Sequence, residues 1–388
     1  MKTIYLDHAA ATPLDPRVKR AMDRVACAYG NPSSVHRIGR DAKAFLDASH
    51  RDIGKSVGAR SEEITLTGSG TESDNLAIFG IARAYADVGR HIITTNIEHH
   101  AVLRACQRLE RDGFEVTYVG VKPNGIVDSD DIMKAIRPDT ILVSVIYANN
   151  EIGTIQPIKE ISKALKLYSS KAVKFHTDAC QAVGYLDINV QNLGVDLMTI
   201  NGSKIYGPKG TGALFVRRGT KIAPTILGGD QERGLRAGTE NAALFSGFAV
   251  ALKIADAKKK ESKRLSVLRD HLIRRITTEI SGAHLNGDPI RRLPNNINIS
   301  LDNIDGEILM LALDLKGIEV STGSACTVMS NEQSHVLQAL QKAPQPYSST
   351  AIKLEGNIRI TLGRGTTKKD LDYTVEILKK EVTRLRNL

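Results

Sequence analysis

The feature that most constrains the fold is an alternation of short β-branched runs with amphipathic segments between residues 63 and 216. The runs that read as strands are EITLT, HIITT, FEVTYVGV, TILVSVIYA, VKFHTDA, DLMTING and TGALFV. Segments with helical periodicity, such as ESDNLAIFGIARAYADV and PIKEISKALKLYS, lie between several of them. Strands separated by helices predict an α/β fold with a mostly parallel sheet that helices cover on both faces.

A second, smaller pattern follows a long helical segment over about residues 241–280. Its strand candidates are NNINISL, GIEVST and NIRITLG, and a last helix is expected over about residues 369–386. A chain of 388 residues favours two domains. We therefore expect a large α/β domain over residues 15–255 and a smaller α+β domain over residues 1–14 and 256–388.

Two further features bear on the compartment. No tract approaches the ~20 consecutive apolar residues of a membrane span, and the N-terminus lacks the apolar centre of a signal peptide. The four cysteines, Cys27, Cys106, Cys180 and Cys326, are widely spaced without a CxxC pair, which favours reduced thiols over disulfides. Together these features predict a cytoplasmic protein with no membrane contact.

The formal net charge of +10 raises the question of an acidic partner. Basic residues cluster in KKKESKR, over residues 258–264, and at Arg291 and Arg292. A solvated helix face is the preferred interpretation, and a docking face for an acidic protein or RNA is the alternative. Direct nucleic-acid binding is not expected, because no recognition motif or interleaved aromatic residue accompanies these clusters.

Ligands of open parallel sheets gather outside the carboxyl ends of the strands, so the residues after each strand are the candidates. The first set is Gly68-Ser69-Gly70-Thr71-Glu72, which opens directly into a helix. Backbone N–H groups and the helix dipole at Gly70 and Thr71 suit a phosphate. An ordinary capped turn explains the same residues equally well. A dinucleotide site is not supported, because the third glycine of GxGxxG is missing.

The next strand ends lead into His99-His100 and into Asn149-Asn150. Adjacent histidines point in different directions and no CxxC or HExxH accompanies them, so we predict no metal site. A histidine that stacks on a ligand or moves a proton is the better functional interpretation of this turn, and a structural histidine is the alternative. The asparagines suit either a ligand contact or a left-handed turn.

An acid and a lysine stand at the ends of neighbouring strands. Asp178 follows VKFHT, and Lys204 lies in NGSKIYGPKG, one strand–helix–strand unit later. This pair suits pyridoxal phosphate (PLP), with the acid at the pyridinium nitrogen and the lysine in a Schiff base with the aldehyde. A buried structural salt bridge is the alternative. A P-loop is excluded, because Lys209 falls one place late for GxxxxGK[ST] and no Ser or Thr follows it.

The second domain offers a thiol and a guanidinium. Cys326 lies in STGSACTVMSNEQSH, a loop of small residues that suits nucleophilic chemistry, whereas Cys27, Cys106 and Cys180 read as packed cysteines. Arg359 alternates with apolar residues in NIRITLGR and so points away from the buried face. It suits either bidentate binding of a substrate carboxylate or an exposed strand position.

These motifs jointly resemble a known family. YLDHAAATP, GNPSSVHRIGR, TGSGTESDNLAI, EHHAVL, NNEIGTIQPI, HTDACQAVG, NGSKIYGPKGTGALFV, GGDQERGLRAGTEN, STGSACT and NIRITLGR occur in the order seen in NifS/IscS-type cysteine desulfurases. Those enzymes belong to the class-V aminotransferase group of the PLP fold-type-I superfamily. The match covers nearly the whole chain, and the long loop after GSAC is similar to that of the NifS/IscS branch.

The resemblance implies a role for each matching residue. Lys204 looks like the Schiff-base lysine, Asp178 the partner of the ring nitrogen, Gln181 the contact to the ring oxygen, and His99 the residue stacked on the ring. Gly70, Thr71, Asn201 and Ser203 look like phosphate contacts, and Thr239 is similar to one that the second subunit of a homodimer contributes. Asn150 and Arg359 look like ligands of the substrate carboxylate, and Cys326 like the nucleophile that forms a persulfide.

The implied reaction converts L-cysteine to L-alanine, with delivery of the sulfur to an acceptor such as an iron–sulfur scaffold or a tRNA-thiolation protein. Ser203 departs from the pattern, because many members have a histidine immediately before the lysine. A selenocysteine lyase, or another class-V PLP aminotransferase-like enzyme, is the alternative. Cys326 argues against an aminotransferase, which has no need of a nucleophilic thiol.

Overall fold

The strands expected between residues 63 and 216 form one sheet in the computed structural model, which describes residues 3–168, 173–257, 259–323, 333–343 and 356–387. They are β2 (Ile64–Thr67), β3 (His91–Thr95), β4 (Glu115–Val119), β5 (Thr140–Ser144), β6 (Lys174–Asp178), β7 (Leu197–Asn201) and β8 (Gly212–Val216), in the order β2-β8-β7-β6-β5-β3-β4. Strands β3 to β7 pair in parallel, whereas β8 is antiparallel to both its neighbours. The prediction of a mostly parallel sheet is confirmed.

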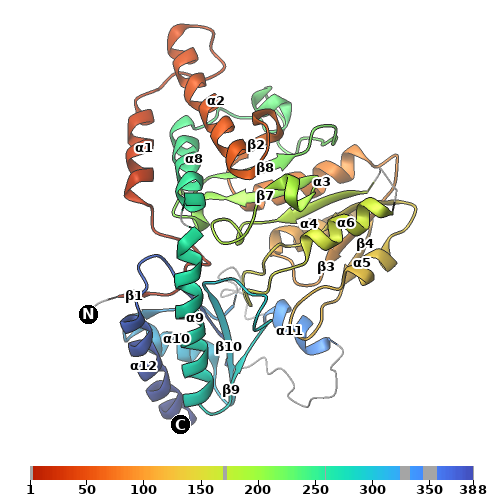
Figure 1. Cartoon of the computed structure of the whole chain (residues 1–388). Coiled ribbons are helices and arrows are strands. Elements are labelled where there is room, and N and C mark those ends of the chain that lie inside the picture. Colours follow the sequence, from red (N-terminus) through yellow and green to blue (C-terminus); the bar gives the residue numbers. More distant parts are fainter. Residues whose placement is uncertain (1–2, 169–172, 258, 324–332, 344–355, 388) are drawn as a thin grey trace.

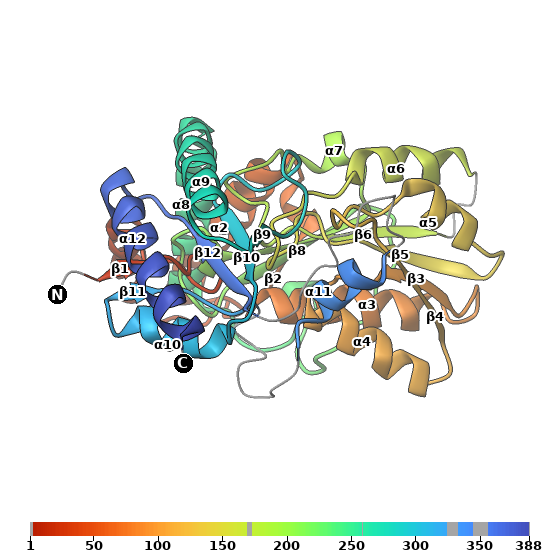
Figure 2. The same cartoon turned by 90° about the horizontal axis from the view of Figure 1, so that it is seen from below.

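Helices cover both faces of this sheet. They are α1 (Pro16–Ala26), α2 (Arg37–Val57), α3 (Gly70–Ala84), α4 (His100–Arg111), α5 (Ser129–Ala135), α6 (Ile158–Leu167), α7 (Val190–Leu193) and α8 (Ala242–Ala257). Figure 2 shows α3 and α4 on one face and α5, α6 and α7 on the other. Helix α8 packs against α1 and α2 (Figure 1). Because both faces are covered, every residue of β3 and β5 is buried.

A second body lies beside the carboxyl ends of the large sheet and contains both ends of the described chain (Figure 1). Its elements are β1 (Ile4–Tyr5), α9 (Lys259–Glu279), β9 (Ala283–Leu285), β10 (Asn296–Leu301), α10 (Gly306–Asp314), β11 (Ile318–Glu319), β12 (Ile358–Thr361) and α12 (Lys368–Arg386). Strands β12, β10 and β9 form an antiparallel sheet, and β1 pairs in parallel with β11. Strands β1 and β9 were not expected from the sequence, because two or three residues are too few to show an alternating pattern.

One helix from the C-terminal part of the chain packs against the core of the large sheet. Helix α11 (His335–Lys342) buries Val336, Leu337 and Leu340 in the same apolar cluster as the β5 and β6 core. A separate cluster joins Ile4 and Leu6 to residues 265–382. The division at residues 15–255 stays a prediction. Within the described ranges, no helix combines the length and apolarity that crossing a membrane requires.

Candidate active site

One cavity of about 200 Å³ collects most of the predicted site residues. Its wall contains Gly70, Thr71, His99, Asn150, Asp178, Gln181, Asn201, Lys204 and Arg359. Residues that the sequence analysis did not name for the site also line it, namely Ala9, Ala10, Asp74, Ile146 and Cys180. A larger hollow of about 780 Å³ lies beside α2 and contains none of the predicted residues, so size alone does not identify the site.

The large sheet explains why distant residues meet in this cavity. Asp178 and Asn201 are the last residues of β6 and β7, while His99 and Asn150 follow β3 and β5. Gly70 follows β2, which runs in the same direction as β7 because both are antiparallel to β8. All of these residues therefore stand at one edge of the sheet, where ligands of such sheets bind.

Lys204 ends a single 3₁₀ turn, Gly202–Lys204, directly after β7. The Asn201 side chain caps this turn, and its Oδ1 accepts from the backbone N–H (2.7 Å) and the hydroxyl (2.9 Å) of Ser203. The Ser203 hydroxyl is thus directed to Asn201, and Ser203 does not line the cavity. The Lys204 amine does line it and donates to the Ala10 carbonyl over 2.6 Å.

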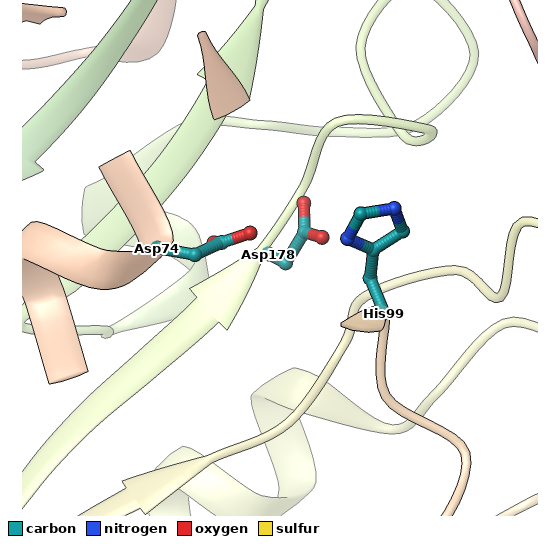
Figure 3. Close-up of side chains that lie close together, drawn as sticks. All are labelled: Asp74, His99 and Asp178. Atoms are coloured by element: carbon teal, nitrogen blue, oxygen red, sulfur yellow. The ribbon is translucent and has the colours of Figure 1, made fainter. Parts of the chain in front are cut away.

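Asp178 lies between Asp74 and His99 (Figure 3). One possible ligand atom of each of these three residues lies within 4.8 Å of the other two. Asp178 is 5% exposed, and its Oδ1 accepts from the Cys180 backbone N–H over 2.9 Å. Asp74 comes from α3 and is 1% exposed. A second carboxyl group, which no local sequence pattern indicated, therefore lies close to the predicted acid.

The environment of Asp74 disfavours its charged form. Burial raises the pKa of Asp74 well above its usual range, and the Asp178 carboxylate raises that pKa further. His176 offers no compensating cation, because burial lowers its pKa to about 4. The charged form of Asp74 is therefore strongly disfavoured. A carboxyl group that resists ionisation is a poor metal ligand.

His99 is fixed as the N-cap of α4. Its Nδ1 accepts from the Ala101 backbone N–H over 3.1 Å, so the neutral ring carries its proton on Nε2. Its neighbour His100 is turned away from the cavity wall and packs its ring 4.7 Å from that of His335. The expectation that the two histidines point in different directions agrees with this arrangement.

The turn before α3 has the form of an anion seat. Ser69 caps the helix by accepting from the Glu72 N–H over 3.1 Å, and Gly70 and Thr71 begin the 15-residue helix at the cavity wall. A Cβ on Gly70 would lie 2.8 Å from Cys180 Sγ and 3.2 Å from Asn201 Nδ2, so only glycine fits there. Unsatisfied N–H groups at such a helix start bind phosphate.

Thr239 lies outside this cavity and is exposed. Arg236, three residues before Thr239, nevertheless lies close to the turn before α3 in the same chain. Arg236 forms an ion pair with Glu72 over 2.9 Å, and the other Glu72 oxygen accepts from the Gly68 N–H over 2.8 Å. The second-subunit role of Thr239 stays a prediction.

Arg359 is 2% exposed, which excludes the alternative of an exposed strand charge. Its Nη2 forms an ion pair with Asp7 over 2.8 Å, and its Nη1 donates to the Asn150 carbonyl over 3.2 Å. The buried Nε has no hydrogen-bond partner among the described residues. The guanidinium is thus held rigidly in the cavity wall, and its Nε can still donate a hydrogen bond.

The N-terminal segment also contributes to the site, which was not expected from the sequence. Gln181 Nε2 donates a hydrogen bond to the Ala9 carbonyl over 3.0 Å.

The cysteines divide by environment. Cys106 and Cys180 are buried, and burial raises the pKa of both thiols, so neither suits a thiolate nucleophile. Cys27 is exposed at the end of α1, so the expectation that it is packed is wrong. The local sequence does not show that this end of the helix lies at the surface. Cys326 lies outside the described residues.

Comparison with known proteins identifies the family. The model of the class-V aminotransferases matches residues 4–374. The chain belongs to the class-V aminotransferase family. It is 50% identical over 390 residues to a cysteine desulfurase IscS from Dictyoglomus turgidum, which covers 100% of this chain and 96% of that protein.

Solved structures also resemble this one over most of the chain. A NifS-like protein is similar with a TM-score of 0.90 at 34% identity, covering 99% of this chain and all of that one. The protein SspA, solved in complex with cysteine, is similar with a TM-score of 0.79 at 33% identity, covering 93% of this chain and 99% of that one. The PLP fold-type-I architecture expected from the sequence is therefore confirmed.

Class-V aminotransferases use PLP, and the residues of the cavity fit that cofactor. Lys204 offers an amine for the aldehyde, and Asp178 offers a carboxylate for the ring nitrogen. The start of α3 is a cradle that a Cβ on Gly70 would fill, which suits the phosphate. The chain is thus a PLP-dependent enzyme. The other residues of the cavity wall, Asn150 and Arg359 among them, are the candidates for selecting its substrate.

Proposed function

We propose that the protein is a PLP-dependent cysteine desulfurase, which converts L-cysteine to L-alanine and leaves the sulfur as a persulfide on Cys326. The observation that carries the proposal is the cavity that joins Lys204, Asp178 and Arg359. These groups match the amine, the ring nitrogen partner and the carboxylate ligand that an amino-acid substrate on PLP needs. The 50% identity to an IscS enzyme supports L-cysteine as the substrate.

The chain's own residues divide the work of binding and proton transfer. When bound, PLP supplies an electrophilic carbon for the substrate amine and a ring that withdraws electrons from the substrate Cα. Arg359 and Asn150 hold the substrate carboxylate, and Lys204 takes the proton from Cα as a general base. Asp178 keeps a negative charge at the ring nitrogen. His99 lines the cavity with Nδ1 bonded to the Ala101 N–H, so Nε2 is the ring nitrogen left to exchange a proton with the substrate thiol.

Cys326 performs the sulfur transfer. Its thiolate attacks the substrate sulfur, so that a sulfur–sulfur bond forms while the substrate carbon–sulfur bond breaks. The electron pair of the broken bond stays with the substrate carbon, which takes a proton and leaves as alanine. An acceptor protein, such as an iron–sulfur scaffold or a tRNA-thiolation protein, then removes the outer sulfur.

The active enzyme is a cytoplasmic homodimer in this proposal. The exposed position of Thr239, outside the cavity of its own chain, suits a contact to the partner's phosphate site. Exposed apolar side chains of Tyr29, Val35 and Leu227 offer surface for the interface. Sedimentation equilibrium of the purified protein tests the dimer.

The reaction itself is tested with the purified enzyme, L-cysteine and a reductant. The protein is expected to absorb visible light through its PLP and to release sulfide and alanine in equal amounts. S-methyl-cysteine, whose sulfur has no proton, serves as the control and should give neither product. A colourless protein, or alanine without sulfide, would contradict the proposal.

Replacing the ring-nitrogen partner tests the assigned charges. Asp178→Asn is expected to lower kcat/KM about 100-fold or more, because it removes the carboxyl group that would partner a protonated ring nitrogen. Asp74→Asn replaces an acid whose pKa burial raises well above its usual range by a neutral amide of the same shape. The decrease in kcat/KM for Asp74→Asn should be at least about tenfold smaller than that for Asp178→Asn. Equal losses in the two variants would contradict the assignment.

Arg359→Lys tests recognition of the substrate carboxylate. Lysine keeps the positive charge that faces Asp7 but loses the planar fork, so KM for L-cysteine should rise by about 10- to 100-fold while kcat falls less. Steady-state kinetics measure both constants, and the melting temperature checks folding. An unchanged KM in a folded variant would exclude Arg359 as the carboxylate ligand.

A further inference from the structure

One buried carboxylate lies against both ends of the segment that carries Cys326. Glu151 is 1% exposed, and its Oε2 accepts from the Ser334 hydroxyl over 2.5 Å. At the other end, a Cβ built on Gly323 would lie 3.3 Å from the same Oε2. Residues 323 and 334 therefore both lie close to the same carboxyl group, although ten residues separate them in the sequence.

The Glu151 backbone is held from both bodies of the molecule. Its N–H donates to Asn149 Oδ1 over 2.9 Å, and its carbonyl accepts from Nδ2 of Asn298, on β10, over 3.2 Å. Asn149 is fully buried and donates to the Ile97 carbonyl over 2.8 Å. The carboxylate thus extends from a rigid turn, next to the proposed substrate ligand Asn150.

The start of α11 is anchored at a second point. The His335 ring nitrogen Nε2 lies 2.9 Å from the Glu98 carbonyl and donates to it, and Glu98 immediately precedes His99. Ser334 also caps α11, because its Oγ accepts from the Leu337 N–H over 3.1 Å. Val336 and Leu340 bury their side chains in the large core. Helix α11 is therefore fixed to the turns that carry Asn150 and His99.

We infer that Glu151 is a positioning residue for the sulfur-transfer step: it binds Ser334 and lies close to Gly323, two described residues on either side of Cys326 in the sequence. The inference rests on the proposed role of Cys326. It explains why a buried carboxyl group that does not line the cavity lies beside Asn150, where an apolar side chain would avoid the cost of burying a polar group.

Variants of Ser334 and Glu151 distinguish the bond between these two residues, called the anchor below, from the cap that Ser334 provides to α11. Glu151→Gln removes the charge at nearly constant volume. Ser334→Asp keeps a good N-cap but places a second carboxylate against Glu151, whereas Ser334→Thr keeps both the cap and the hydroxyl. Ser334→Thr is therefore the matched control and should behave as the unchanged enzyme.

Two steps are then measured on the PLP-loaded enzyme with L-cysteine. The absorbance change on mixing follows substrate binding, and mass spectrometry of quenched samples follows the persulfide on Cys326. Glu151→Gln and Ser334→Asp should leave the binding step within about twofold and slow persulfide formation about tenfold or more, the size expected for a lost hydrogen bond to a charged group. Persulfide formation at the unchanged rate in both variants would overturn the inference. A decrease in substrate binding as large as the decrease in persulfide formation would also overturn it.

Hydrogen exchange of α11, measured without L-cysteine, tests the anchor apart from the reaction. The amides of residues 337–342 should exchange about tenfold faster in Glu151→Gln and Ser334→Asp than in Ser334→Thr. Equal exchange in all three would overturn the anchor. If the unaltered enzyme forms no persulfide while exchange still differs, the proposed function fails and the positioning role of Glu151 in sulfur transfer fails with it, but the anchor of α11 stands.

Discussion

Lys204→Ala is expected to abolish the covalent attachment of PLP and to lower the rate of desulfuration by about 10³-fold or more, since it removes both the attachment point and the general base. The fixed position of the amine explains the size of the effect. The Asn201 cap shapes the turn, and the Ala10 carbonyl accepts from the amine over 2.6 Å. No other lysine lines the described cavity wall, so none is placed to substitute.

Borohydride reduction followed by peptide mass spectrometry measures the attachment directly. In the unaltered enzyme, the peptide that contains Lys204 should gain the mass of the reduced cofactor. Lys209→Ala is the matched control, because Lys209 lies in the same glycine-rich stretch but is exposed and outside the cavity. Attachment at another lysine in Lys204→Ala, or loss of attachment in Lys209→Ala, would refute the assignment.

The large sheet could be predicted because its signal is local. β-Branched runs and helical periodicity each occupy a few consecutive residues, and the strands expected from them pair in one sheet. The rule that ligands gather at carboxyl strand ends then led to Asp178, His99 and Asn150 without knowledge of their contacts. The family resemblance added Gln181 and Asn201, which both line the cavity.

The parts that could not be predicted depend on contacts between distant residues. The carbonyls of Ala9 and Ala10 reach the site only because β1 pairs with β11 and brings the N-terminal segment to Gln181 and Lys204. Asp74 looked like an ordinary helix residue, and its raised pKa follows from burial and from the nearby Asp178. Local sequence likewise could not decide between a buried and an exposed Arg359, because its partner Asp7 lies 352 residues away.

Cys326→Ser is expected to reduce sulfide release to background while leaving the absorbance change with L-cysteine intact. A serine hydroxyl is a far weaker nucleophile than a thiolate and cannot form a persulfide, whereas PLP and substrate are held by residues of the cavity wall. The neighbours in sequence support this residue as the nucleophile, because Ser334 binds Glu151, next to Asn150, and Gly323 lies close to the same carboxyl group.

The control for this prediction is Cys27→Ser, which removes the exposed cysteine of the described chain. It should release sulfide at the unaltered rate, because Cys27 ends α1 and does not line the cavity. Cys106 and Cys180 are inert by burial, which raises the pKa of both thiols. If Cys326→Ser kept its sulfide release and Cys27→Ser lost it, the nucleophile would be Cys27, and sulfur would have to leave the cavity before transfer.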